Sequence, residues 1–158
     1  MVVYLIQHAE AKSKEEDPDR GLTDDGIAAA TKIAGFFSEQ SPVVDAIWHS
    51  NKKRARQTAE ILADALGCQD KVSEHAGLAP KDDVSPVAQE LASFSKEAVV
   101  LVGHMPFVSR LASKLLAGHP SAGHPDKELV KFRNAGIVCI LEDQGAWKLG
   151  WMITPALI

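Results

Sequence analysis

The sequence predicts a single α/β domain, and three features support that prediction. The chain has 158 residues, which is near the usual size of one domain, and such a domain can bury roughly 70% of its unfolded surface. Short apolar runs typical of strands alternate along the chain with longer runs of helical periodicity. The run Ala98–Val102 is apolar throughout, as expected for a strand covered on both faces.

The first third of the chain predicts a strand, a loop and a helix. Val2 begins an apolar run that stops at His8, and valine, isoleucine and tyrosine favour strands. Residues 12–20 are rich in charge and interrupted by a proline, which indicates a surface loop. Thr23 suits a helix N-cap, and the apolar residues after it fall on one helical face. We therefore expect a helix that runs to about Glu39.

The middle of the chain predicts two further strands and two helices. Val43–Trp48 has strand character, and Lys52–Leu66 has helical periodicity followed by Gly67 as a C-cap. Asp70–Glu74 fits a short strand, and a helix beginning at Ser85 fits the residues to Phe94.

The final third predicts a helix, a loop and a closing hairpin. Ala98–Val102, the buried strand, is followed by a helix over Pro106–Leu116 with proline in its first turn. Residues Gly118–Pro125 have the composition of a loop. Ile137–Glu142 and Trp147–Ile153 flank a Gly-containing turn, which is typical of an antiparallel hairpin.

Composition limits the class of function. Hydrophobic residues make up 46% of the chain, charged residues 24%, and the net charge is −4, so we expect neither a nucleic acid nor a membrane as partner. Any phosphate-binding charge must be local. No apolar run approaches the roughly 18 residues of a membrane span, and no basic segment precedes the short N-terminal run; we expect a cytoplasmic protein. Cys68 and Cys139 form no CxxC pair, so we interpret them as packing residues.

Polar residues that could take part in catalysis or binding follow three of the predicted strands. His8 comes directly after the first strand, where ligands bind in open α/β sheets. Taken alone, a histidine in that position is more often a structural or surface residue than a nucleophile. Its neighbour Gln7 is neutral.

A basic segment follows the second predicted strand. Residues 50–59 run from the strand end into the next helix and contain Arg54 and Arg56. Backbone amides at a helix start and the planar arginine fork both suit a phosphoryl group, although a solvated basic helix face explains the segment equally well. The two arginines lie about 200° apart around the helix, so only one can face a pocket.

Two more segments add candidate ligands for an anion. Gly103 and His104 end the buried strand just before a proline-started helix, where an anion would rest. A capping or core histidine is the competing interpretation. Arg20 leads into the first helix and could reach the same sheet edge, or it could be an ordinary loop arginine.

Taken in order, these segments resemble the histidine phosphatase superfamily of phosphoglycerate-mutase-like proteins, and in particular its small SixA-like phosphohistidine phosphatases. That family opens with a strand ending in Arg-His-Gly and then has Arg-Pro-Leu-Thr-x-x-Gly, Ser-Pro-x-x-Arg-Ala-x-Gln-Thr-Ala and Gly-His-x-Pro segments. The corresponding segments here are Gln7-His8-Ala9, Arg20 to Gly26, Ser50 to Ala59, and Gly103 to Pro106. The likeness spans almost the whole chain.

The resemblance implies a fold and a mechanism. The fold would be a three-layer α/β/α sandwich, with a mostly parallel mixed sheet flanked by helices, in one domain over residues 1–158 without a large cap domain. His8 would attack phosphorus and form a phosphohistidine that water hydrolyses, with no metal and no other cofactor. Arg54, His104, Arg20 and Gln7 would hold the phosphoryl oxygens, because phosphoryl transfer needs mainly positioning and charge stabilisation. Arg56 would face away.

Some residues depart from the family motifs. Gln7 stands where the family has an arginine that grips the phosphoryl group, and loss of one such donor costs roughly 10²–10³ in rate. Ala9 replaces a glycine, which requires a negative φ. Asn51 and Gly21 replace prolines, so we expect looser loops there.

The resemblance also bears on the substrate. Glu74, Asp82 and Asp83 match no acid-bearing motif of the larger relatives, so we interpret them as surface carboxylates. A phosphohistidine substrate needs no dedicated acid, since solvent can protonate the leaving imidazole. Without a cap, a phosphorylated protein, such as a histidine-phosphorylated signalling protein, fits better than a buried metabolite. A small phosphorylated molecule is the other expected partner, and we expect a monomer.

Three hypotheses therefore compete. The first is a metal-independent phosphatase, of weakened activity because of Gln7. The second is a catalytically impaired relative that binds phosphate or a phosphoprotein. The third is a metal hydrolase with His8, His49 and His104 as ligands, although the sequence has no short-spaced ligand pair.

Overall fold

The computed structural model of the chain describes residues 1–117 and 128–158. Within these residues, six strands and four α-helices alternate for most of the chain, which confirms the predicted α/β class. In chain order the elements are β1 (Val2–Gln7), α1 (Asp24–Glu39), β2 (Ala46–His49), α2 (Lys53–Leu66), β3 (Val72–Glu74), α3 (Ser85–Ala92), β4 (Ala98–Gly103), α4 (Phe107–Ala117), β5 (Ile137–Asp143) and β6 (Ala146–Ile153). The predicted loop Gly118–Pro125 lies outside the described residues.

The strands form one mixed sheet in the order β3-β2-β4-β1-β5-β6. β4 pairs in parallel with both β1 and β2, and β2 pairs in parallel with β3. β5 is antiparallel to β1 and to β6. The register sets Gln7 opposite Gly103 and His49 opposite Val102. The carboxyl ends of β1, β2 and β4 therefore meet at one edge of the sheet, where ligands bind in α/β folds.

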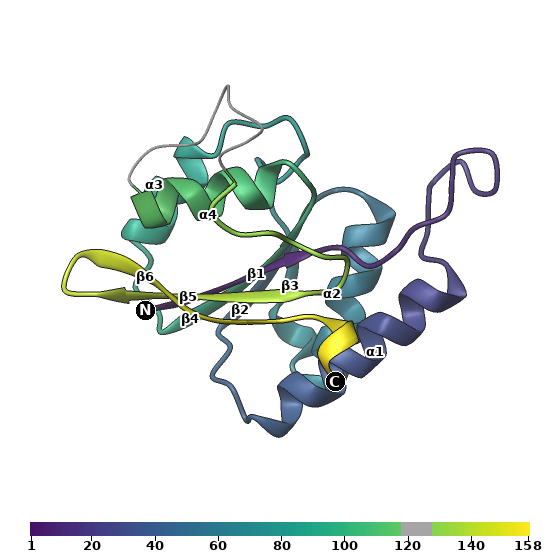
Figure 1. Ribbon diagram of the computed structural model, residues 1–158, viewed down its shortest axis with the longest axis horizontal. Helices are drawn as coiled ribbons and strands as arrows, with labels where there is room; N and C mark the ends of the chain where they lie inside the picture. The colour runs from purple at the N-terminus through teal and green to yellow at the C-terminus, as the bar shows by residue number, and fades with distance from the viewer. Residues whose placement is uncertain (118–127) are drawn as a thin grey trace.

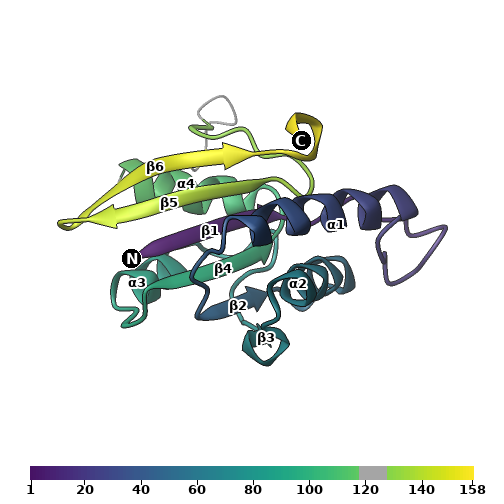
Figure 2. The ribbon, with the colours of Figure 1, turned by 90° about the horizontal axis from the view of Figure 1, so that it is seen from below.

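Two pairs of helices cover the two faces of the sheet (Figures 1 and 2). Along β1, Val3 and Leu5 belong to the core under α3 and α4, whereas Tyr4 and Ile6 belong to the core under α1 and α2. This alternation follows from the two-residue period of a strand. β4 is buried along its whole length between these two cores, which explains why it is apolar throughout. The structure thus has the three layers that the family resemblance implied, and no large cap domain covers the sheet edge.

The start of α1 depends on two residues that the sequence places there. The Thr23 hydroxyl accepts a hydrogen bond from the Gly26 amide and caps the helix. A Cβ atom on Gly26 would overlap the carbonyl oxygen of Glu10, so glycine lets the helix pack against the chain that leaves β1. This contact fixes α1 relative to the segment that carries His8.

Several element boundaries differ from the predicted ones. β2 begins at Ala46 instead of Val43, because the Asp45 carboxylate accepts the amides of Glu97 and Ala98 and holds the preceding chain outside the sheet. Val43 is accordingly 54% exposed. Residues 69–71 form a 3₁₀ turn, so β3 is shorter than predicted.

The helices on the other face also differ slightly in extent. α3 ends at Ala92, short of the predicted Phe94. α4 begins at Phe107, and Pro106 precedes it with its carbonyl accepting the amide of Arg110.

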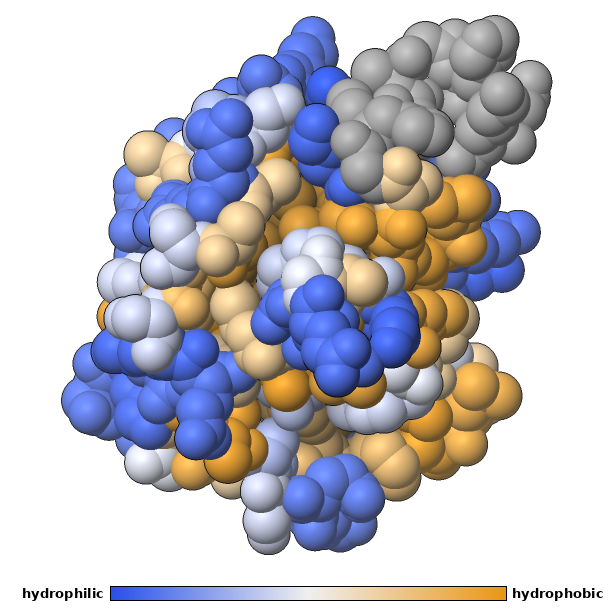
Figure 3. Space-filling model, turned by 90° about the vertical axis from the view of Figure 1, so that its left-hand side faces the viewer, coloured by the Kyte–Doolittle hydropathy of each residue, from blue (hydrophilic) through white to orange (hydrophobic). Residues whose placement is uncertain are grey.

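The end of the molecule away from the functional edge mixes hydrophobic and hydrophilic residues (Figure 3). The β5–β6 hairpin turns through Gln144 and Gly145, both with positive φ. It carries four large exposed apolar side chains, Leu141, Leu149, Trp151 and Met152.

None of the helices in the described ranges is long and apolar enough to cross a bilayer. Cys68 and Cys139 are free thiols buried in the core.

Candidate active site

His8 leaves the end of β1 with its ring fixed by a backbone hydrogen bond. Its Nδ1 lies 2.6 Å from the carbonyl oxygen of Ala9. A carbonyl can only accept, so Nδ1 carries the proton and Nε2 of the neutral ring holds the free electron pair. The arrangement leaves Nε2 as the reactive atom.

Arg54 faces that atom from the first turn of α2. Its Nε–H donates to His8 Nε2 over 3.2 Å. Arg56 instead pairs with Glu60 at 3.6 Å, and its side chain is more than half exposed. The helix geometry therefore brings Arg54, and not Arg56, to the strand ends.

Burial and nearby charge keep His8 neutral. The pKa of His8 is lowered to about 4, first by burial and then by the charges of Arg54 and Arg20, against an opposing effect of the Ala9 hydrogen bond. Burial, followed by the charge of Arg20, also lowers the pKa of Arg54, although an arginine stays protonated. At neutral pH the site pairs an uncharged imidazole with two guanidinium groups.

His104 follows β4 and completes the constellation. Its ring centroid lies 4.9 Å from that of His8, and the residue is 2% exposed. Burial, followed by the charges of His8, Arg54, Lys52 and Arg20, lowers the pKa of His104 to about 3. His104 is therefore a neutral ring at physiological pH.

Ser50 holds one nitrogen of His104. The Ser50 hydroxyl lies 2.5 Å from His104 Nε2 and also accepts the Lys52 amide at 3.4 Å. Nδ1 of His104 is buried and has no hydrogen-bond partner among the described residues. Buried polar atoms are usually satisfied, and an oxyanion beside Nδ1 would satisfy this one if Ser50 donates to Nε2.

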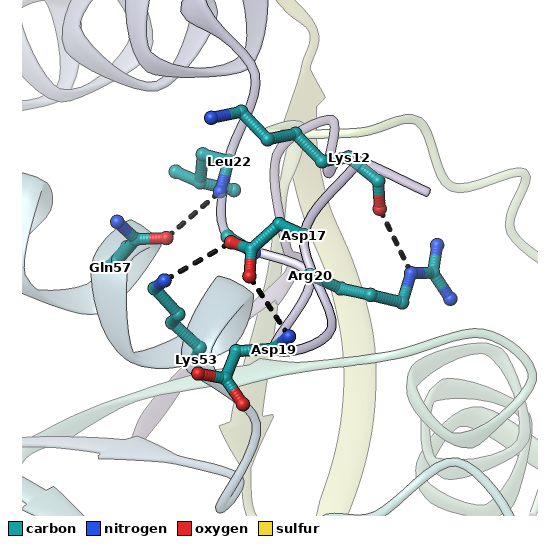
Figure 4. Close-up of polar contacts among 8 residues, drawn as sticks. Lys12, Asp17, Asp19, Arg20, Leu22, Lys53 and Gln57 are labelled. Atoms are coloured by element: carbon teal, nitrogen blue, oxygen red, sulfur yellow. Dashed lines mark hydrogen bonds and ion pairs between the residues drawn. The ribbon is translucent and has the colours of Figure 1, made fainter. Parts of the chain in front are cut away.

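Arg20 comes from the loop between β1 and α1 and has a positive φ of 53°. Its Nε donates to the carbonyl of Lys12 at 3.0 Å. Figure 4 shows how the same loop is tied to α2: the Asp17 carboxylate accepts Lys53 Nζ at 3.1 Å, and Gln57 accepts the Leu22 amide at 2.9 Å. These contacts hold the guanidinium near the strand ends, where its charge acts on both histidines.

Gln7 turns its amide toward the chain before β5. Gln7 Nε2 donates to Asn134 Oδ1 at 2.6 Å, and the backbone carbonyl of Gln7 accepts the Ala135 amide. The side chain stands next to His8 but carries no charge. Its other donor capacity remains available to a phosphoryl oxygen.

The other departures from the family motifs fit the backbone. Ala9 is not among the described residues with positive φ, and its amide donates to Thr58 Oγ1 at 3.1 Å. The Gly21 amide donates to Asp17 at 2.9 Å, a bond that proline could not make. The expected loosening at Gly21 is therefore opposed by an additional contact, and Asn51 is exposed.

The remaining candidates lie apart from the reacting atoms. Asp82 and Asp83 accept backbone amides of Ala79 and Ser85 and stabilise the turn before α3. Glu74 lies at a cavity beside the site. Nδ1 of His49 lies 2.8 Å from the carbonyl oxygen of the next residue, Ser50. Within the described ranges, no three histidine, cysteine or acidic side chains form a group that could hold a metal ion.

Sequence reasoning assigned no role to Ser50, Thr58 or Asn134. The first two lie inside the basic segment after β2, but their partners His104 and Ala9 are 54 and 49 residues away. Asn134 meets Gln7 across 127 residues. Nothing in local sequence encodes such pairs; the only available signal was that Ser50 and Thr58 belong to the recognised motif.

Two neutral histidines and two arginines lie where the parallel strands of the sheet end, and they define a class of site: one suited to holding an oxyanion beside a nucleophilic imidazole. The model of the histidine phosphatase superfamily (branch 1) matches residues 3–80. A Picosynechococcus protein of uncharacterised function is 32% identical over 145 residues, which cover 87% of this chain and 83% of that protein. The chain belongs to the histidine phosphatase superfamily.

Solved structures agree over nearly the full length. The protein histidine phosphatase SixA, determined with tungstate, superimposes with a TM-score of 0.86 and 23% identity over 99% of both chains. A structure from Agrobacterium tumefaciens assigned as the phosphohistidine phosphatase SixA gives a TM-score of 0.75 and 26% identity over 98% of this chain and 97% of that one. Family and neighbours together support phosphatase activity.

Proposed function

We propose that the protein is a metal-independent phosphatase that acts on phosphohistidine through a covalent intermediate on His8. The observation that carries this proposal is the tautomer of His8. Its Nδ1–H is held by the Ala9 carbonyl, and Nε2 faces the Arg54 guanidinium. A neutral imidazole with a fixed free electron pair beside a cation is suited to attack an anionic phosphorus centre.

The reaction would proceed in two displacements. In the first, Nε2 of His8 forms a bond to phosphorus while the bond from phosphorus to the leaving nitrogen breaks. The leaving imidazole takes a proton from solvent. In the second, water attacks the phosphohistidine, releases inorganic phosphate and returns the electron pair to Nε2. Arg54, Arg20 and His104 would balance the charge on the oxygens in both steps.

The open sheet edge supports a substrate carried by a protein. No large cap domain encloses the site, and the cavity beside it is bounded by the loop before α1 and the start of α2. Of the three carboxylates considered as acids, Asp82 and Asp83 serve the turn before α3, and Glu74 is exposed. A phosphoramidate bond, with a leaving group that solvent can protonate, suits these surroundings.

One observation favours a second candidate function. Gln7 donates one of its side-chain N–H groups to Asn134 and has no charge, whereas the family has an arginine at this position. A protein that binds a phosphoryl group without turnover would fit that loss. In this alternative His8 and Arg54 retain the anion site but hydrolysis is negligible.

Turnover of phosphoramidate tests the first proposal. We expect hydrolysis that is unchanged by EDTA and abolished in His8→Ala, together with an acid-labile phosphoryl adduct trapped on the native protein and absent from the variant. Hydrolysis that persists in His8→Ala, or that is lost with EDTA and restored by a divalent cation, would overturn it.

The Gln7→Arg variant separates the two candidates. If Gln7 limits an otherwise intact site, this variant should raise turnover by about 10²-fold, whereas Gln7→Met should not raise it. Tungstate binding to both proteins with no turnover in either would favour the impaired alternative.

A further inference from the structure

A cavity of about 560 Å³ adjoins the proposed reaction centre without containing it. Arg20 and Arg54, whose charges act on His8, line the cavity. Lys14 and Lys52 line it as well, together with the acidic residues Asp19 and Glu74. His8 and His104 are not among its lining residues. A single phosphoryl group bound at His8 would therefore leave most of this volume free.

The cavity gathers positive charge in a chain whose net charge is −4. Two of its cations have carboxylate partners: Lys53 pairs with Asp17 and Arg56 with Glu60. Lys14 and Lys52 make no ion pair with any described residue. They come from separate segments, the loop before α1 and the residue before α2, that the Asp17–Lys53 contact holds together.

These lysines exceed what one phosphoryl group needs. Arg54, Arg20 and His104 already suffice for the oxygens of the transferred group, and neighbouring like charges repel one another unless an anion lies between them. Figure 4 shows the shared loop from which Arg20 extends away from Lys53. An anion in the cavity would relieve the repulsion among Arg20, Arg54 and Lys52.

We propose that this cavity binds a second anionic group of the substrate, a carboxylate or a phosphoryl group, next to the phosphoryl group that is transferred. The inference rests on the proposed function, because it names the substrate class of that same site. The preferred substrate is then an acidic one: a phosphorylated protein segment with aspartate or glutamate beside the phosphohistidine, or a small molecule with two phosphoryl groups. Lys14 and Lys52 are the specificity-determining residues.

The decisive comparison uses two phosphohistidine peptides and the full-length protein. One peptide carries aspartate and glutamate beside the phosphohistidine, and the other carries asparagine and glutamine. We expect a higher kcat/KM for the acidic peptide, through a lower KM, with an advantage that shrinks as salt rises. A small bisphosphate compared with its monophosphate forms a parallel arm, and the larger of the two preferences identifies the source of the second anion.

The variants assign the preference to the cavity. Lys14→Gln and Lys52→Gln should each reduce the acidic preference by roughly three- to fivefold, the range of a partly exposed ion pair. Glu74→Gln should increase the preference. Lys96→Gln, an exposed lysine before β4 at the other end of the sheet, is the matched control and should change nothing.

Each failure has a distinct signature. If phosphoramidate is hydrolysed but neither the acidic peptide nor the bisphosphate is preferred, the second-anion site is wrong and the phosphatase stands. If no substrate turns over, binding of the two peptides to His8→Ala decides: equal affinity overturns the inference, and a lysine-dependent preference for the acidic peptide supports it although the phosphatase proposal fails.

Discussion

The protonation of His8 decides whether the site can act as a nucleophile. With its pKa lowered to about 4, chiefly by burial, the ring stays neutral across the physiological range. We expect the acid limb of kcat/KM near pH 4 instead of near the ordinary histidine value, and ¹⁵N NMR of the ring should show Nδ1 protonated above that pH. A His8 transition close to pH 6.5 would contradict this expectation.

The same shift predicts how stability changes with pH. The unfolded His8 ring takes up a proton near pH 6.5, whereas the folded ring does so only near pH 4. The free energy of unfolding should therefore fall as the pH drops through that window. Arg54→Met removes a charge that lowers the pKa of His8, so this variant should raise the pKa of His8. The size of that rise separates the effect of the Arg54 charge from the effect of burial.

Ser50 should act as a positioning residue for His104. Ser50→Ala removes the partner of a buried imidazole nitrogen, and we expect a loss of about tenfold in kcat, with KM less affected, because the ring can then adopt the other tautomer. Ser50→Thr keeps a hydroxyl and should recover activity.

Ser109→Ala is the matched control for Ser50. Ser109 is buried in α4 and its hydroxyl has no partner among the described residues, so its loss should leave turnover intact. Equal effects of the two alanine variants, or no recovery with threonine, would assign Ser50 a packing role only.

At the scale of elements, the Asp17 carboxylate is one of the contacts that hold the loop between β1 and α1 to α2. Backbone hydrogen bonds from Gly21 and Asp19, followed by Lys53, lower the pKa of Asp17 to about 2. This contact stabilises the loop above the ordinary aspartate pKa and is lost only as the pH falls through about 2. Asp17→Asn should speed amide exchange at Gly21 and reduce phosphoramidate turnover by about tenfold, because Arg20 loses its fixed position.

Asp19→Asn is the control for that loop. Its carboxylate has no partner among the described residues, and its backbone amide still donates to Asp17. Exchange at Gly21 and phosphoramidate turnover should both stay at the native level. Native exchange in Asp17→Asn would show that the loop is held by Gln57 and the Lys12–Gly21 backbone contact instead.

The type of each element could be predicted, but its ends could not always be. The apolar run of β4 and the periodicity of α1 are local signals, and both elements are where the sequence placed them. The early start predicted for β2 was wrong because Val43 has strand character in isolation, whereas Asp45 binds amides 52 and 53 residues away. Contacts of that range override local propensity.

The candidate site divides in the same way. His8, Arg54 and His104 could be singled out because each follows a strand that is recognisable from its own residues. The orientation of the His104 ring depends on Ser50, which lies 54 residues away in the chain and meets it only after the sheet is assembled. Sequence thus indicated the candidate groups and not the hydrogen bonds that orient them.

At the scale of the whole molecule, anion binding should be coupled to global stability. His8, Arg54 and His104 come from three segments that the register of β1, β2 and β4 brings together. An oxyanion that contacts all three residues binds the folded chain and not the unfolded one. Tungstate at 100 times its dissociation constant should therefore add about 2.7 kcal/mol to the free energy of unfolding. For a domain of this size, that corresponds to a rise in Tm of about 5–10 °C.

Two neighbouring arginines make the test of that coupling specific. Arg54→Met should abolish most of the tungstate-dependent rise in Tm, because it removes the guanidinium that faces His8. Arg56→Met removes the same charge from a side chain of α2 that pairs with Glu60 instead of facing His8, and should retain the rise. If both variants lose the rise equally, tungstate acts through the general positive charge of α2 and does not join the three strand ends.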